Sequence, residues 1–187
     1  KVFPMQAVIP PELKIDVSVQ PLVLSDATLS RADGAVVLLE KKAGQDQAVD
    51  KLPQAALWRK LLQAHQRSGQ EAPILVTRLP NRSQTLVVVG FAPPGATGFE
   101  LLQLAGKLAH EVLKPGVVRL QLHANKFTAP GERTAVLEAV LSAVLAHAAP
   151  MPEQKSKPTV AHDLAHVHIA DRPSALYDRS RAIAAGN

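Results

Sequence analysis

Two hydrophobic periods alternate along the chain. Short runs in which every second residue, or every residue, is apolar alternate with longer stretches whose apolar residues recur every three or four positions. Residues 13–19 (LKIDVSV) alternate strictly, which predicts a strand with one covered face. Residues 35–40 (AVVLLE) are almost continuously apolar, as in a strand buried on both faces. The succession of strand and helix patterns predicts a layered α/β domain.

The same patterns place the remaining elements. Further strands are expected at 74–79, 85–91, 117–122 and 161–170, and helices at 54–67, 99–113, 132–148 and from about 173 onward. Turn residues at 80–83 (PNRS) favour a hairpin between two of the strands. Because crossovers between parallel strands are right-handed, we expect a three-layer sandwich: a mixed, mostly parallel sheet of about six strands with helices on both faces.

Composition narrows the class of protein. The chain has 187 residues, 47% of them hydrophobic, which suits one domain with a sizeable core and excludes a disordered chain. No 18-residue stretch lacks polar residues, so no membrane partner is expected. The net charge of +5 is spread along the chain and aromatic residues make up 3%, which argues against nucleic acid as a partner. The absence of cysteine fits a reducing cytoplasm, our predicted location.

Three histidines form the first candidate site. His162, His166 and His168 fall in the strand expected at 161–170, where residues of equal parity share a face. Same-face neighbours on a strand lie about 7 Å apart, so His166 and His168 could both reach one zinc ion, whereas His162 is too distant without a bend. The alternative is a solvent-facing, half-polar strand face without metal.

The second candidate is a glycine-bearing loop between a strand and a helix. Gly90, Gly95 and Gly98 frame the sequence APPGATG, and such a loop at a helix N-terminus can bind phosphate. The spacing is not GxGxxG, and two prolines remove amide donors. The alternative is structural: Gly90 closes a tight turn and Thr97 caps the helix that follows.

Other catalytic patterns find no support in the sequence. No Gly-x-Ser-x-Gly elbow occurs, and no pair of carboxylates is expected at the strand ends. The remaining histidines are isolated from one another and are not expected to act as bases: His65, His110, His123 and His147. From the residues alone we assign no catalytic residue, cofactor-binding residue or metal ligand, and we expect this chain by itself not to be an enzyme.

The order of segments resembles a known family. The series DGAVVLLEKKAG, TLVVVGF, LLQLAGKLAHEVL, VVRLQL, TAVLEAVLSAVLAHA, a QKSKP segment at 154–158, AHVHIAD and finally ALYDRSRAIAAGN is similar to the N-terminal domain of the leucyl aminopeptidase (cytosol aminopeptidase) metallopeptidases. The resemblance covers most of the chain. Its most specific pieces are residues 154–157 and the closing segment 182–187.

The resemblance implies a fold and a role. It implies a macro-domain-like α/β N-terminal domain over residues 1–172, and over 173–187 the start of a linker helix toward a C-terminal catalytic domain. In that family the N-terminal domain helps to assemble a homo-hexamer and shapes access to the active sites. The catalytic domain holds two divalent metal ions, zinc or manganese, and removes N-terminal amino acids from peptides. Its Asn-Thr-Asp-Ala-Glu-Gly-Arg motif does not occur here, so none of the family's catalytic residues is placed on this sequence and no cofactor is assigned to it.

The likeness to macro domains also suggests a rival function. Macro domains bind ADP-ribose with a glycine-rich diphosphate loop, which the segment from Gly90 to Gly98 could imitate, and with an asparagine-rich loop. No Asn-Ala-Ala-Asn-like segment occurs in this sequence. A binding module for ADP-ribose or a related nucleotide is therefore the alternative function.

Overall fold

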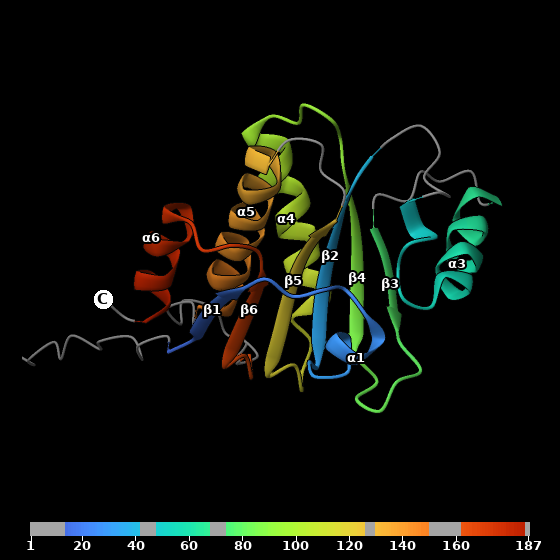
Figure 1. Ribbon diagram of the computed structural model, residues 1–187, viewed down its shortest axis with the longest axis horizontal. Helices are drawn as coiled ribbons and strands as arrows, with labels where there is room; N and C mark the ends of the chain where they lie inside the picture. Colours follow the sequence, from blue (N-terminus) through green and yellow to red (C-terminus); the bar gives the residue numbers. More distant parts are fainter. Residues whose placement is uncertain (1–13, 42–47, 68–73, 126–129, 150–161, 186–187) are drawn as a thin grey trace, which may run out of the picture.

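A central sheet of six strands forms the middle layer of the computed structural model, which describes residues 14–41, 48–67, 74–125, 130–149 and 162–185 (Figure 1). The strands are β1 (Asp16–Gln20), β2 (Gly34–Glu40), β3 (Ile74–Arg78), β4 (Leu86–Ala92), β5 (Arg119–Asn125) and β6 (His166–Ala170). The helices are α1 (Asp26–Leu29), α3 (Ala55–Arg67), α4 (Gly98–Val112), α5 (Pro130–Ala148) and α6 (Ala175–Ala184).

The strands follow the order β1-β6-β5-β2-β4-β3 across the sheet. All neighbouring pairs are parallel except β3 and β4, which form an antiparallel hairpin. The turn predicted at 80–83 lies in that hairpin, where the amide of Leu79 donates to the carbonyl of Thr85 at 3.0 Å. The expected mixed, mostly parallel sheet is confirmed.

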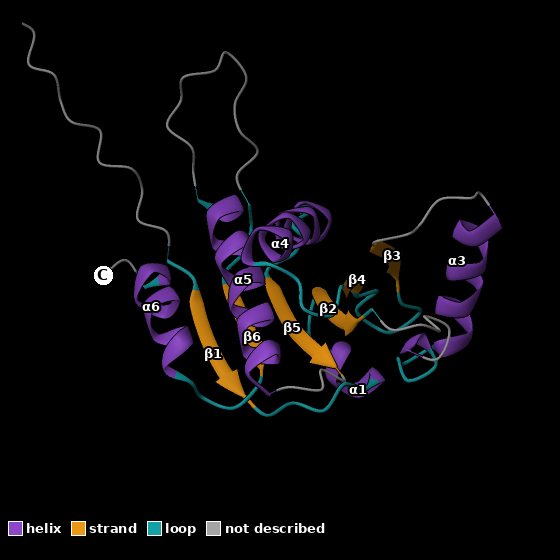
Figure 2. Ribbon diagram, turned by 90° about the horizontal axis from the view of Figure 1, so that it is seen from above, coloured by secondary structure: helices purple, strands orange, loops and turns teal. Residues whose placement is uncertain are grey.

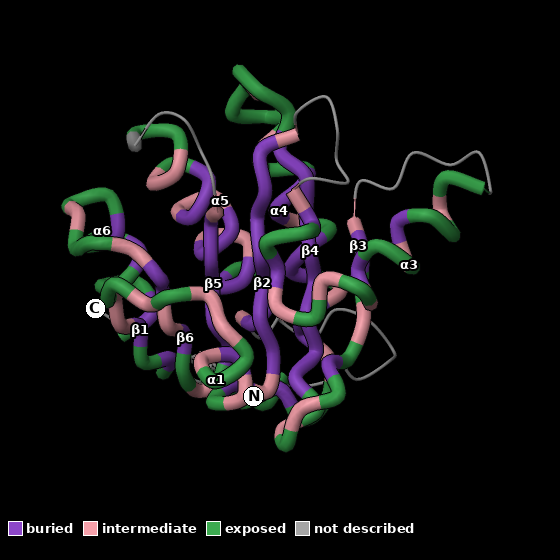
Figure 3. Tube along the Cα trace, turned by 45° about the vertical axis from the view of Figure 1, so that its right-hand side comes forward, coloured by how far each residue is buried: buried purple, intermediate pink, exposed green. Residues whose placement is uncertain are grey.

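Helices cover both faces of the sheet, so the three-layer sandwich is also confirmed. Figure 2 shows α4, α5 and α6 on one side and α1 and α3 on the other. The first side forms the larger core, in which apolar residues of the three helices pack on side chains from β1, β2, β4, β5 and β6. The second core is smaller and joins α1 and α3 to β2, β3 and β4 around Trp58. Strands β2 and β4 are buried along their whole length (Figure 3) because both cores pack on them.

Gly90 sets how closely α4 packs on the sheet. It lies inside β4, and a Cβ atom placed there would come within 2.9 Å of Leu108 Cδ2 on α4. Leu108 is fully buried, so it has no open space into which to move. The expected role for Gly90 in a tight turn is therefore wrong: the strand continues to Ala92, and the glycine serves helix–sheet contact.

Two further expectations need correction. The last strand begins at His166 rather than 161, because the residues just before it follow another path: the Asp163 carboxylate accepts a hydrogen bond from the Gly116 amide at 2.9 Å. The four-residue helix α1 was not expected, since its pattern is too short for helical periodicity. Ser25 caps it by accepting a hydrogen bond from the Thr28 amide.

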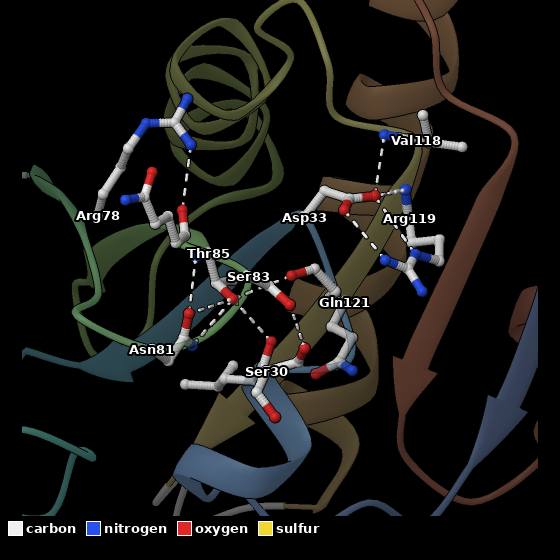
Figure 4. A network of polar contacts seen from close by, with 12 residues as sticks. Ser30, Asp33, Arg78, Asn81, Ser83, Thr85, Val118, Arg119 and Gln121 are labelled. Carbon is white, nitrogen blue, oxygen red and sulfur yellow. Dashed lines mark hydrogen bonds and ion pairs between the residues drawn. The ribbon is translucent and has the colours of Figure 1, made fainter.

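A polar network joins the loops at the amino ends of β2, β4 and β5 (Figure 4). The buried Thr85 hydroxyl lies 2.8 Å from the carbonyl oxygen of Leu29 and 2.9 Å from that of Ala32. Asp33 accepts hydrogen bonds from the Arg119 backbone amide at 2.9 Å and from its guanidinium at 3.2 Å. Although burial opposes it, the hydrogen bonds and charge of Arg119 hold the pKa of Asp33 below its usual value. These contacts fix the edge of the sheet opposite to the one where open α/β sheets bind ligands.

The Gly90 contact generates a paired prediction. Gly90→Ala should lower the free energy of unfolding by about 1–3 kcal/mol, because overpacking a filled core forces side chains from their preferred positions. Gly106→Ala on α4 is the matched control: its Cβ atom would meet nothing within 4 Å. Alanine there should raise the stability by about 0.4–1 kcal/mol. Urea unfolding followed by circular dichroism measures both, and equal effects of the two variants would contradict the packing argument.

Candidate functional site

The carboxyl ends of the parallel strands form the first candidate site. Strand β2 lies between β4 and β5, and in open α/β sheets ligands bind outside the carboxyl ends of strands where the direction of the strand order changes. A cleft of about 130 Å³ opens at the end of β2 and β4. Its lining comes from the loop after β4, the first turns of α4 and α5, and the last residue of β2: Glu40, Ala92, Pro93, Pro94, Gly95, Ala96, Leu101, Glu132, Ala135 and Val136.

Of the three glycines of the predicted phosphate loop, one borders this cleft. Gly95 lies in the loop with φ +67°, a conformation that favours glycine. Gly90 lies within β4, as described above, and Gly98 is the first residue of α4. The structure therefore spreads the three glycines over a strand, a loop and a helix.

The N-terminus of α4 is capped by side chains of its own first turn, those of Thr97 and Glu100. Thr97 caps the helix as predicted, and Glu100 completes a capping box: its Oε2 accepts hydrogen bonds from the Thr97 amide at 2.8 Å and the Thr97 hydroxyl at 2.9 Å. These bonds, the amide first, lower the pKa of Glu100. The Thr97 amide thus already donates to a carboxylate, and the Glu100 amide donates to Thr97 Oγ1 at 3.3 Å.

The cleft itself is lined by acidic groups. Glu40, 9% exposed, and Glu132, in the first turn of α5, both contribute to its wall. Glu40 ends an apolar strand, whereas Glu132 lines the same cleft from the first turn of a helix and not from a strand end. Within the described residues this charge favours a cationic or neutral occupant over a diphosphate.

The three predicted histidines separate into a pair and a single residue. His166 and His168 lie on β6 and share a face, whereas His162 lies in the segment before the strand and is exposed. His166 Nδ1 lies 3.5 Å from Asp16 Oδ2 on β1, and His168 Nδ1 forms a short hydrogen bond with Ser18 Oγ. In the part of the chain that the structure describes, no group of three or more histidine, aspartate or glutamate side chains is arranged to hold a metal ion.

A buried polar pair on β5 was missed at the sequence level. His123 and Gln121 are both 3% exposed, and His123 Nε2 donates to Gln121 Oε1 at 3.0 Å. Gln121 Nε2 in turn donates to the Thr28 carbonyl at 3.0 Å, which ties α1 to the sheet. Burial, and secondarily the charge of Arg133, lowers the pKa of His123 to about 4. The sequence does carry a pattern that places Gln121 and His123 on one face of a strand, since polar residues at 119, 121, 123 and 125 alternate with apolar ones.

A second, partly buried network joins α5, β6 and α6. Asp171 follows β6 and accepts hydrogen bonds from the Tyr177 hydroxyl at 2.6 Å and the Thr134 hydroxyl at 3.3 Å. Arg133 donates to the Ala170 carbonyl at 2.7 Å, with its Nε 3.6 Å from Asp171 Oδ1. Burial, and then the bond to Asp171, raises the pKa of Tyr177. Neutral tyrosine and charged arginine thus share one carboxylate, which anchors the start of α6.

Together the sheet order and the two cores define the chain as a three-layer α/β domain, and comparison with solved structures finds the same fold. A mutant of tomato leucine aminopeptidase matches 93% of this chain and 37% of its own at 10% identity, with a TM-score of 0.65. A leucyl aminopeptidase from Leishmania major, in complex with actinonin, matches 89% of this chain and 31% of its own at 15% identity, with a TM-score of 0.46.

At 10% identity, the match to the tomato protein shows a shared fold and nothing more. The chain spans about a third of the length of these two proteins. No family model and no curated protein matches its sequence. In the described residues no helix combines the length and apolar character needed to cross a bilayer.

His123 makes stability depend on pH. The unfolded chain binds a proton on His123 below its ordinary pKa of 6.5, whereas the folded chain binds one only below about 4. Between these values the unfolded state holds more protons, so stability should fall as the pH falls from 6.5 to 4, by on the order of 3 kcal/mol. His123→Gln should flatten this part of the curve of unfolding free energy against pH.

The matched control is His110→Gln, on the exposed face of α4. It should leave the curve unchanged. Urea midpoints at half-unit pH steps for the three proteins provide the measurement. The assignment to His123 is wrong if the wild-type decline between pH 6.5 and 5 persists in His123→Gln.

Proposed function

We propose that this chain is the non-catalytic N-terminal domain of a leucyl aminopeptidase-like enzyme. The observation that carries the proposal is the fold match to tomato leucine aminopeptidase, which covers nearly all of this chain and about a third of that one. The order of sequence segments described above supports the same assignment. In this proposal residues 1–172 form the macro-domain-like unit, and 173–187 begin the connection to a catalytic domain.

The proposed role is assembly of a cytoplasmic homo-hexamer and control of access to its active sites. Exposed apolar side chains support a role in contacts with other subunits or with the catalytic domain. Phe99 and Leu102 on α4 are 70% and 55% exposed, and Leu176 and Ile183 on α6 are 48% and 55% exposed. A contiguous patch of such side chains is typical of a surface that becomes covered in an assembly.

The chemistry of the whole enzyme belongs to the other domain in this proposal. Two divalent metal ions, zinc or manganese, held by the catalytic domain, would activate water for removal of N-terminal amino acids. This chain would supply neither metal ligands nor an acid–base group to that reaction. Its partners would be its own catalytic domain and sister subunits.

The alternative, an ADP-ribose-binding module, has weaker support. The cleft at the carboxyl ends of β2 and β4 is in the right place for a nucleotide. However, Glu40 and Glu132 line it, and Glu100 already accepts hydrogen bonds at the adjacent helix N-terminus. A diphosphate would have to displace or approach these carboxylates.

The proposal predicts a division of activity between this chain and the full product of its gene. The full product should hydrolyse leucine p-nitroanilide with added Zn²⁺ or Mn²⁺ and lose that activity with a chelator. Residues 1–187 alone should show no hydrolysis under the same conditions. Sequencing the gene past Asn187 and assaying both proteins tests this, and a gene ending at Asn187, or an inactive full product, would overturn the proposal.

Calorimetry with ADP-ribose tests the alternative function, nucleotide binding. The acidic cleft leads us to expect no saturable heat for residues 1–187. A Kd tighter than about 100 µM, equivalent to roughly −5.5 kcal/mol of binding free energy, would instead favour the nucleotide-binding function. In that case Glu100→Gln should strengthen binding, because it removes a negative charge beside the helix N-terminus.

A further inference from the structure

One half of the sheet presents polar side chains where the other half presents an apolar core. The parallel register aligns Asp16 with His166 and Ser18 with His168. It also aligns His166 with Arg119 on β5. The apolar cluster on this side of the sheet contains residues from β2, β3 and β4 but none from β1, β5 or β6. This polar half-face, which carries Asp16, Ser18, Arg119, His166 and His168, is therefore not part of the apolar core beside it.

Both imidazoles on this half-face contact side chains of β1, His166 at ion-pair distance and His168 through a hydrogen bond. Each directs its Nδ1 toward an oxygen on β1: His166 toward Asp16 Oδ2 at 3.5 Å, and His168 toward Ser18 Oγ in a short hydrogen bond. Among the contacts between described residues, neither Nε2 atom has a hydrogen-bond partner. The Ser18 hydroxyl can donate to His168 Nδ1 or accept from it. In the tautomer in which Nδ1 carries the proton, Nε2 keeps its lone pair for a metal ion.

We propose that His166 and His168 bind one divalent transition-metal ion of the zinc, nickel or copper class through their Nε2 atoms. Histidines that bind metals commonly donate their other ring N–H to a carboxylate or another oxygen, which orients the ring and raises its basicity. Asp16 and Ser18 are placed for that role. Residues two apart on a strand are about 7 Å apart at the backbone, and Zn–N bonds are about 2 Å long, so the two rings can converge on one ion.

The ligand set defines the class of ion and the openness of the site. Imidazole nitrogen favours zinc, nickel and copper over magnesium and calcium, which prefer oxygen ligands. Because two side chains ligate the ion, water would fill the remaining positions. His166 has a side chain that is 47% exposed, which leaves the site accessible from solvent.

The cationic side chain that the register aligns with His166 is turned away from the site. Arg119 is aligned with His166 in the register, but its guanidinium bonds to Asp33 on the far side of β5, with NH2 3.2 Å from Oδ1 and Nε 3.4 Å from Oδ2 (Figure 4). Its charge is therefore paired with a carboxylate. Asp16 adds a negative charge next to His166, which favours a bound cation.

Titration of tag-free residues 1–187 with Zn²⁺ at pH 7.5 by calorimetry tests the proposal. We expect saturable binding of one ion per chain. His166→Ala and His168→Ala should each lower the affinity by at least about tenfold, and Asp16→Asn by up to about tenfold through the orientation of His166. His162→Ala is the matched control, since His162 is exposed and lies outside the strand, and it should bind as the wild type does.

A spectroscopic readout distinguishes ligation from general effects on folding. In ¹⁵N-edited spectra of the imidazole nitrogens, Zn²⁺ should shift Nε2 of His166 and His168 while both Nδ1 atoms stay protonated. Should His168→Ala unfold, His168→Gln replaces it, because glutamine keeps a polar side chain at that position. Absence of saturable binding below about 1 mM Zn²⁺, a limit near −4 kcal/mol, would overturn the proposal. An equal loss in His162→Ala would do the same. The outcome is independent of the proposed function, which concerns activity of the full gene product.

Discussion

The contact between Leu108 and the backbone of β4 at Gly90 sets the spacing of the layers. Because residue 90 has no Cβ atom, α4 approaches β4 closely and its apolar face joins the larger core. Helix α5 packs beside α4 and on β5, and α6 packs beside α5. This close approach lies on β4, the second strand from the β3 edge of the sheet, and α6 is held in place by the hydrogen bond from Tyr177 to Asp171.

The two faces of the sheet are used differently. One is apolar across five strands and is covered by α4, α5 and α6. The other is apolar over β2, β3 and β4 but polar over β1, β5 and β6, where the connection from β1 to α1 crosses in front of β6 and β5 (Figure 1). Gln121 secures that connection through Thr28. The sheet therefore carries an apolar core on both faces of β2 and β4, and polar side chains on one face of β1, β5 and β6.

Much of the fold follows from local patterns, whereas the candidate sites depend on contacts between distant residues. The run AVVLLE at 35–40 and the stripe at 132–148 identify a central strand and its covering helix because their periods are strong. The capping of α4 by Thr97 was equally readable from residue type. Asp163, in contrast, accepts a hydrogen bond from Gly116, 47 positions away, and the expected strand begins only after it, at His166. That Glu40 and Glu132 line one cleft likewise depends on the sheet order, which no local pattern supplies.

The first and last described elements meet at one corner of the domain. The amide of Ile15, before β1, donates to the carbonyl of Ala184, in α6, at 3.0 Å. The two ends of the described chain therefore lie next to each other, although 169 positions separate Ile15 from Ala184. The described chain thus starts and ends at the same corner of the domain. Such a unit can be inserted within a longer chain, or joined end to end by a short linker and reopened elsewhere, without extending either end across the sheet.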